Sequence, residues 1–272
     1  MPSSESDISP PLRIAAVRYL NTAPLICALE GRADVRLARA VPAHLLEALL
    51  AGQADAALVP AIDLQRSPVP LTVLPAGCIA SAGETLTVRV FSHVEPAEVT
   101  VLAADTESHT SVALAAVLWA QRFGRRLEIV PREQFQAACA HAVLLIGDKV
   151  VTDPPADCPH QADLGQMWFE MTRLPFVFAV WAARADEGKA RHARLFEVLN
   201  GSRLQCAGRL DDLARHHGPR HGWPVDLARR YLTQHLQYEF TPDCRRGMEE
   251  FHRLAQKHGV IDLTRILEYF NP

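Results

Sequence analysis

Residues 13–25 read RIAAVRYLNTAPL and predict a buried strand, a polar turn and the start of a helix. Pro24 suits a first helical turn, because its fixed φ is tolerated there and breaks a strand. In an open α/β sheet, the loop leaving the carboxyl end of a strand commonly holds ligands. Asn21 lies in that loop. It is either a ligand-binding residue or a cap of the following helix, and this stretch alone favours the cap.

The following residues alternate between helical and strand patterns. Short links between a strand at 13–17, a helix after Pro42 and a strand at 56–59 predict a parallel sheet with right-handed crossovers. Further strands are expected at 71–74, 85–91, 98–104, 142–146 and 174–181, and helices at 112–123 and 132–140. After Gly188 the pattern is helical, with helices expected at 189–200, 204–217, 225–238, 243–258 and 262–270. The last of these would turn Leu263, Ile266, Leu267 and Phe270 inward.

Composition excludes several classes of protein. The chain has 272 residues, enough for one large domain or two lobes, and a net charge of -3 spread over interspersed charges. Such a surface has no strong electrostatic field that would attract nucleic acid or a membrane surface. No apolar run approaches the ~20 residues that a membrane-spanning helix needs. Residues 1–11 resemble a frayed tail rather than an export signal. Six scattered cysteines without a CxxC pair favour reduced thiols in a cytoplasm over zinc or disulfides.

Small polar residues at strand ends are the candidates for chemistry. The turn at 105–111 opens an apolar helix, so it is either an anion site or a cap provided by Ser108 or Thr110, and the two interpretations are balanced. Asp148 follows a strand, where it is either a catalytic carboxylate or, as is commoner, a cap or a turn residue. The histidines of residues 216–221 are expected in a solvated loop rather than a metal site. Common nucleotide, zinc-protease and serine-hydrolase motifs are absent. The remaining neutral donors suit a small carboxylate: Asn21, Ser81, Thr87, Ser108, Thr110 and Ser111.

Several short motifs together resemble the chorismate dehydratases of the futalosine route to menaquinone. They occur in the family's order between about residues 13 and 184, and they are YLNTAPL at 19–25, SHTSVAL at 108–114, LIGD at 145–148, DLG at 163–165 and LPFVFAVW at 174–181. The resemblance implies a two-lobed, type II periplasmic-binding-protein-like α/β fold with a helical C-terminal region. We expect residues 12–93 and 178–272 to form the first lobe and residues 94–177 to form the second.

The resemblance also implies an activity and a site. The family converts chorismate, a small dicarboxylate, to 3-[(1-carboxyvinyl)oxy]benzoate and water without a cofactor or metal, as a hydro-lyase. Its active-site asparagine falls on Asn21, and its active-site serine falls on Thr87. We expect the substrate to be bound by Tyr19, Ser81, Ser108, Thr110, Ser111 and Phe176. With no histidine or glutamate at an obvious base position, a carboxylate of the substrate is expected to accept the ring proton.

Three departures from the family pattern stand out. Residues 83–87 read GETLT where the family has Gly-Pro-Val-x-Ser, so Thr87 keeps the hydroxyl and adds a methyl group, while Glu84 would repel a dianion unless it turns outward. Arg18 is expected to form a surface salt bridge rather than a substrate contact, and Arg173 stands where a glycine is usual. The alternative to an enzyme is a solute-binding or sensory module. A carrier of this kind normally has an export signal, and a transcriptional sensor would need a DNA-binding region, so the lack of both patterns favours the enzyme.

Overall fold

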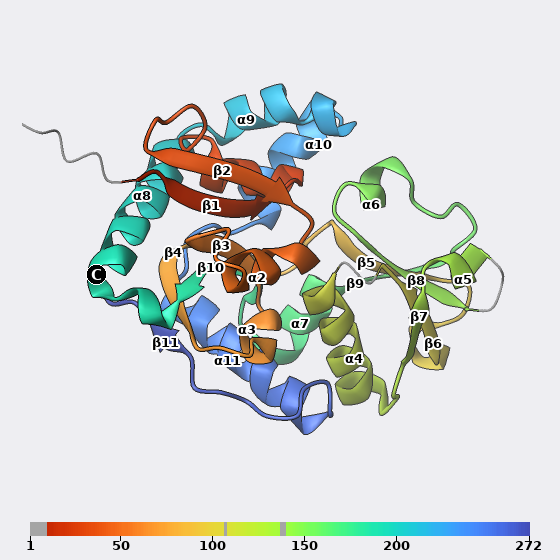
Figure 1. Cartoon of the computed structure of the whole chain (residues 1–272). Helices are drawn as coiled ribbons and strands as arrows, with labels where there is room; N and C mark the ends of the chain where they lie inside the picture. The colour runs from red at the N-terminus through yellow and green to blue at the C-terminus, as the bar shows by residue number, and fades with distance from the viewer. Residues whose placement is uncertain (1–9, 106–107, 137–139) are drawn as a thin grey trace, which may run out of the picture.

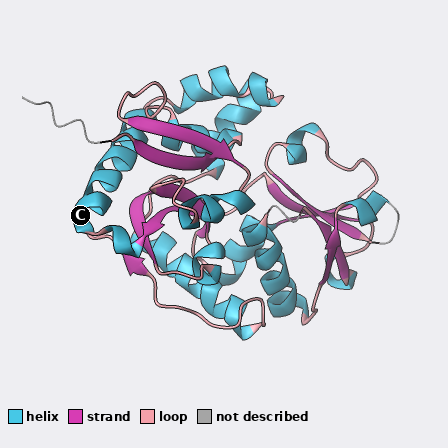
Figure 2. Cartoon of the chain, viewed as in Figure 1, coloured by secondary structure: helices cyan, strands magenta, loops and turns pink. Residues whose placement is uncertain are grey.

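The computed structural model describes residues 10–105, 108–136 and 140–272, and it contains two β-sheets flanked by helices (Figure 1). The larger sheet has six strands in the order β11-β4-β10-β3-β1-β2, and the smaller has five in the order β7-β6-β8-β5-β9. Most helices gather around the larger sheet (Figure 2). The fold is therefore the two-lobed α/β arrangement expected from the sequence.

The first part of the chain builds most of the larger sheet. β1 pairs in parallel with β2 and β3, as the short strand-helix-strand links predict, whereas β10 is antiparallel to β3 and β4, so the sheet is mixed. The elements in this part are β1 (Leu12–Val17), the 3₁₀ turn η1 (Leu20–Thr22), α1 (Ala23–Ile26), β2 (Val35–Ala40), α2 (Ala43–Leu50), β3 (Ala56–Pro60), α3 (Asp63–Arg66) and β4 (Leu71–Ser81).

The middle of the chain builds the smaller sheet. Its elements are β5 (Val88–Ser92), η2 (Pro96–Glu98), β6 (Val101–Ala104), α4 (His109–Phe123), β7 (Glu128–Pro131), α5 (Glu133–Gln136), β8 (Ala142–Ile146), α6 (Lys149–Thr152), β9 (His160–Asp163) and α7 (Leu164–Thr172). β5 joins this sheet ahead of the lobe boundary expected at residue 93, and residues 137–139 of the helix expected at 132–140 lie outside the described residues. The division into lobes at residues 93/94 and 177/178 remains a prediction.

The chain returns to the larger sheet at β10 (Phe176–Arg184) and continues as a mostly helical region. This region contains η3 (Ala185–Glu187), α8 (Lys189–Ala207), α9 (Leu210–His217), η4 (Pro219–His221), α10 (Val225–Arg230), the π-helical turn η5 (Tyr231–His235) and α11 (Pro242–Lys257). α11 packs Phe251 against Trp168 and Phe176, with ring centroids 6.1 and 4.9 Å apart. Residues of the C-terminal region thus share a core with the smaller sheet.

Two expectations for the C-terminal region were wrong. The helix expected at 189–200 does not end there, because α8 continues through Gly201 to Ala207 without a break. Residues 262–270 are not helical, because their end forms β11 (Glu268–Tyr269) and pairs with the edge of β4. Leu263 and Ile266 are accordingly exposed, at 71% and 99%, instead of facing inward. Without β11, β4 would be an edge strand with unpaired backbone N–H and C=O groups. Hydrogen bonding of residues 268–269 to these groups stabilises the extended conformation more than the local helical pattern favours a helix.

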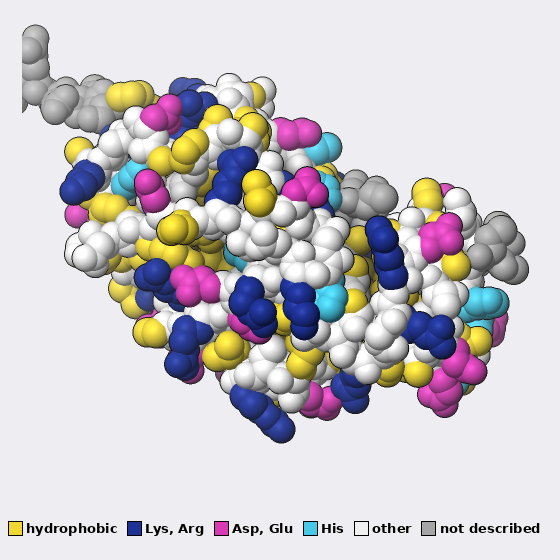
Figure 3. Space-filling model, turned by 90° about the horizontal axis from the view of Figure 1, so that it is seen from below, with side chains coloured by type: hydrophobic (Ala, Val, Ile, Leu, Met, Phe, Trp, Pro, Cys, Tyr) yellow, Lys and Arg dark blue, Asp and Glu magenta, His cyan; other side chains and the backbone are white. Residues whose placement is uncertain are grey.

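The expectation that all the cysteines are reduced was also wrong. Cys27 and Cys206 form a disulfide that joins the residue after α1 to α8, with Cα atoms 6.4 Å apart. Cys78, Cys158 and Cys244 are free and buried. Within the described residues, none of the helices is long and apolar enough to cross a membrane. Basic and acidic side chains are mixed over the face in Figure 3, in line with the small net charge, and a cytoplasmic location remains a prediction.

Acid should destabilise the fold through His252, a buried side chain on α11 that fastens this helix to the loop before α3. Its Nε2 lies 2.9 Å from the carbonyl oxygen of Ala61, and burial lowers its pKa to about 4. In the unfolded chain His252 takes up a proton near pH 6.5, whereas in the folded chain it does so only near pH 4. The free energy of unfolding should therefore fall by up to about 3 kcal/mol between those values.

Urea unfolding across this pH range measures the loss. His252→Gln removes the titrating ring, so the difference between the two proteins isolates its contribution from those of the other histidines. Parallel pH profiles for the wild type and the variant would show that His252 does not contribute to acid destabilisation.

Candidate active site

A cavity of about 630 Å³, its open mouth included, lies between the two sheets. The turn after β1, the end of β3, β5, the start of α4, the end of β8 and η5 all contribute to the lining. Six of the eight expected site residues line it together, namely Tyr19, Asn21, Thr87, Ser108, Thr110 and Ser111.

Asn21 does not serve as a helix cap. It lies inside η1, and neither η1 nor the following α1 has a side-chain hydrogen bond at its cap. The side chain instead lines the cavity and acts on the Tyr231 hydroxyl, whose pKa it lowers, and its Oδ1 accepts from the Thr22 hydroxyl at 3.2 Å. The tight turn after β1 therefore directs an amide into the cavity, which favours the ligand-binding interpretation.

Thr87 meets the same tyrosine from the other sheet. Its hydroxyl lies 2.8 Å from the hydroxyl of Tyr231, and both residues are buried. Burial raises the pKa of the Tyr231 phenol above its usual value, so the phenol stays neutral and keeps a proton to donate. Asn21, Thr87 and Tyr231 thus form one neutral hydrogen-bonding group that spans the cavity.

Tyr231 was missed by the sequence analysis. It lies in a region predicted only as tail helices, and a buried aromatic on a helical stripe has the same pattern as any core residue. Its ring stacks on Trp223, with centroids 4.8 Å apart. Trp223 donates its ring N–H to Asp148, and His221 lies 2.8 Å from the same carboxylate. Asp148, which follows β8 of the smaller sheet, therefore connects this sheet to the C-terminal region rather than capping α6, and His221 contributes to this connection.

The start of α4 presents hydroxyls to the cavity. Ser108 occupies the cap position, but its side chain makes no cap hydrogen bond, while Thr110 accepts from the backbone N–H of Ile62 at 3.3 Å. In an α-helix the first backbone N–H groups have no partner within the helix, and the dipole favours an anion there. α4 has 15 residues, and Ser108, Thr110 and Ser111 all line the cavity at its start. This geometry favours the anion-site interpretation over capping.

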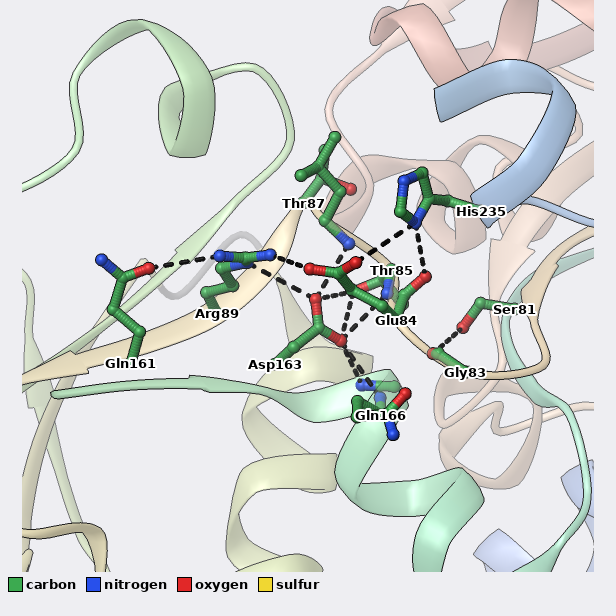
Figure 4. A network of polar contacts seen from close by, with 12 residues as sticks. Ser81, Gly83, Glu84, Thr85, Thr87, Arg89, Gln161, Asp163, Gln166 and His235 are labelled. Atoms are coloured by element: carbon green, nitrogen blue, oxygen red, sulfur yellow. Dashed lines mark hydrogen bonds and ion pairs between the residues drawn. The ribbon is translucent and has the colours of Figure 1, made fainter. Parts of the chain in front are cut away.

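The loop that carries Thr87 is fastened by Asp163 (Figure 4). The Asp163 carboxylate accepts from the backbone N–H groups of Thr85 and Leu86, both at 2.9 Å, and also caps α7 through Gly165 and Gln166. Leu86 has a φ of 67°, a left-handed conformation that is rare for leucine and is held by these bonds. Burial raises the pKa of Asp163, because these donors only partly offset its desolvation.

The same loop explains the Asp-Leu-Gly motif. A Cβ on Gly165 would lie 2.7 Å from the carbonyl oxygen of Gly83 and 2.7 Å from the hydroxyl of Ser81. Real Cβ atoms do not approach that closely, so only glycine lets α7 begin against the loop. Gly147 of the LIGD motif has a similar role, because its Cβ would lie 3.2 Å from the ring of Tyr19 across the cavity.

Two expected substrate contacts lie outside the cavity lining. Ser81 is buried and donates its hydroxyl to the carbonyl oxygen of Gly83 at 3.3 Å. Phe176 is fully buried among aromatic rings, including Phe178 at 4.7 Å. Phe178, two residues along the same strand, lines the cavity in its place. The expected contact at Phe176 is therefore replaced by Phe178, because Phe176 packs into the core instead.

The departures at Glu84 and Arg173 have local explanations, whereas the salt bridge expected for Arg18 is not found among the described residues. Glu84 lies outside the cavity lining and pairs with Arg89, with His235 also 3.7 Å away. Its charge is thus turned outward. Arg173 ends α7 with a φ of 59°, the left-handed position that usually favours glycine. Arg18 is exposed, lies outside the lining and has no salt bridge with the described residues.

The chain has a periplasmic-binding-protein-like fold. The structure of a protein from Archaeoglobus fulgidus superposes with a TM-score of 0.71 at 14% identity, covering 92% of this chain and 98% of that one. An alkanesulfonate-binding protein from Xanthomonas axonopodis pv. citri, bound to MOPS, has a TM-score of 0.64 at 15% identity, covering 93% and 95%. At these identities the likeness shows the fold alone.

The family follows from sequence. A family model described as menaquinone biosynthesis matches residues 12–257. A chorismate dehydratase from Thermus thermophilus is 32% identical over 267 residues, which cover 89% of this chain and 94% of that protein. The chain belongs to this menaquinone biosynthesis family, which confirms the family resemblance seen in the motifs.

Proposed function

We propose that this protein is a chorismate dehydratase, a hydro-lyase that converts chorismate to 3-[(1-carboxyvinyl)oxy]benzoate and water in menaquinone biosynthesis. The relationship to the Thermus thermophilus enzyme supports the substrate. One structural observation supports the chemistry most strongly: Asn21, which follows β1, and Thr87, which precedes β5, line one cavity beside the Tyr231 hydroxyl, to which Thr87 is hydrogen-bonded at 2.8 Å. These neutral groups can orient a ring hydroxyl and hydrogen-bond it as it leaves.

The reaction removes a proton and a hydroxyl from adjacent carbons of the chorismate ring. The C–H and C–O bonds break, a double bond forms between the two carbons, and the proton and hydroxyl leave as water. The enolpyruvyl ether stays attached. Because the product ring is aromatic, the reaction has a large driving force and needs no strong acid from the protein. The cavity lining contains no Asp or Glu among the described residues, so in this proposal a carboxylate of the substrate accepts the proton.

The start of α4 binds a carboxylate of the substrate in this scheme. Ser108, Thr110 and Ser111 offer hydroxyls there together with the first helical N–H groups. Apolar side chains, among them Ile79 and Phe178, line another part of the cavity and can pack against the ring. Orientation between these two walls is what the protein contributes to the reaction.

Incubation of the purified protein with chorismate tests the proposal. The ultraviolet spectrum should change as the ring becomes aromatic, and mass spectrometry should find a product lighter than chorismate by one water. Chorismate that is bound but recovered unchanged would contradict the proposal and support a solute-binding or sensory module instead.

A further inference from the structure

His109 is the one basic side chain in the cavity lining among the described residues. The lining contains no Lys, Arg, Asp or Glu, and its remaining polar groups are hydroxyls, an amide and backbone. The His109 side chain is 34% exposed, so its ring is open rather than part of the core. A dicarboxylate that enters the cavity would otherwise meet only neutral donors, and burying an anion without a counter-charge is costly.

A buried carboxylate holds the His109 ring. Nδ1 of His109 lies 2.9 and 2.8 Å from the two carboxylate oxygens of Asp63, whose side chain is only 3% exposed. Arg66 lies farther from that carboxylate, at 3.8 Å. A carboxylate on Nδ1 fixes a proton there and sets the orientation of the ring. Nε2, the other ring nitrogen, makes no hydrogen bond with any described residue.

The pair has a rigid support. The backbone N–H of Ile62, next to Asp63, donates to the Thr110 hydroxyl at 3.3 Å and so joins α3 to the start of α4. Nε2 of His252 lies 2.9 Å from the carbonyl oxygen of Ala61, the residue before Ile62. Nδ1 of His252 lies 3.1 Å from the side-chain nitrogen of Gln65. Asp63 is therefore fixed from both sides, and it fixes His109 in turn.

We propose that His109 binds a carboxylate of the substrate through Nε2 as an imidazolium, and that Asp63 is the positioning residue that orients it. This inference rests on the proposed function and adds the charged partner that the hydroxyls of α4 lack. The protonated ring donates from both nitrogens, one proton to Asp63 and the other toward the carboxylate. A charge-assisted bond of this kind is roughly twice as strong as a neutral one. His109 then acts in binding, and the proton acceptor remains the substrate.

The test compares His109→Gln, Asp63→Asn and the control His160→Gln. His160 forms a matched histidine-carboxylate pair with Glu95, at 3.6 Å, outside the cavity lining. His109→Gln should raise KM for chorismate about 10- to 100-fold and change kcat little, since it removes one charge-assisted hydrogen bond. The dissociation constant of 3-[(1-carboxyvinyl)oxy]benzoate, measured by calorimetry, should rise by a similar factor. His160→Gln should match the wild type in both measurements.

A double variant tests the positioning role of Asp63. Asp63→Asn should raise KM in the wild-type background but have no further effect when His109 is already Gln, whereas a purely structural role would give additive effects. Unchanged KM and product affinity in His109→Gln would overturn the inference, and so would a lost kcat at constant KM, which would make His109 the acid or base. In both cases the wild type still converts chorismate, so the proposed function stands. A wild type that neither converts chorismate nor binds the product would refute the proposed function itself.

Discussion

Asn21→Ala is expected to lower kcat/KM for chorismate about 100- to 1,000-fold, which is the usual cost of removing one hydrogen bond that stabilises a transition state. Thr87→Val should have an effect of similar size, because it keeps the shape of the side chain and removes only the hydroxyl. Both residues act on the Tyr231 hydroxyl, Thr87 through a hydrogen bond and Asn21 through its effect on the pKa of Tyr231, so the double variant should lose less activity than the product of the two single losses. Steady-state rates with chorismate measure all three.

Asn271→Ala is the control for Asn21, because Asn271 is exposed at the end of the chain. Thermal unfolding should show that every variant is folded. If Asn21→Ala and Thr87→Val both kept full turnover, the assignment of Asn21 and Thr87 as catalytic residues would be wrong.

Asp163→Asn should lower the free energy of unfolding by about 3 kcal/mol, since it replaces a buried carboxylate that accepts several N–H bonds. An asparagine side chain keeps one acceptor and turns an NH₂ group toward backbone donors. Because Asp163 holds Leu86 in its left-handed conformation, kcat should fall as well through misplacement of Thr87. Urea unfolding and steady-state kinetics give the two measurements.

Asp153→Asn is a matched control, since Asp153 is 79% exposed and lies 3.5 Å from Arg132 at the surface. It should change the free energy of unfolding by less than about 1 kcal/mol. An Asp163→Asn protein with wild-type stability and rate would show that the loop reaches its geometry without the carboxylate.

The sequence was most informative where local pattern and tertiary structure agree. The strand-turn-helix at residues 13–25 formed as predicted, because a buried apolar run followed by a proline-started helix has few other solutions. The motifs around Gly147 and Gly165 are now explained by close contacts between segments distant in sequence. The hydroxyls at the start of α4 and the amide of Asn21 line the cavity as expected.

The sequence was least informative where a distant segment decided the outcome. Residues 262–270 have the apolar spacing of a helix, yet their end, Glu268–Tyr269, pairs as a strand with the edge of β4. Cys27 and Cys206 are 179 residues apart, and no spacing rule brings them together. His109 stood inside a quoted motif, but its interpretation depended on Asp63, which lies 46 residues away in α3 and had no local signal of its own.

The most direct test of the account is the proton NMR spectrum of chorismate after incubation with the wild-type protein. The account predicts aromatic signals of a benzoate substituted at the meta position, with the vinyl protons of the enolpyruvyl group retained. Loss of the vinyl signals would indicate a different reaction of chorismate, and an unchanged chorismate spectrum would indicate none. Either result would contradict the assignment of this protein as a chorismate dehydratase.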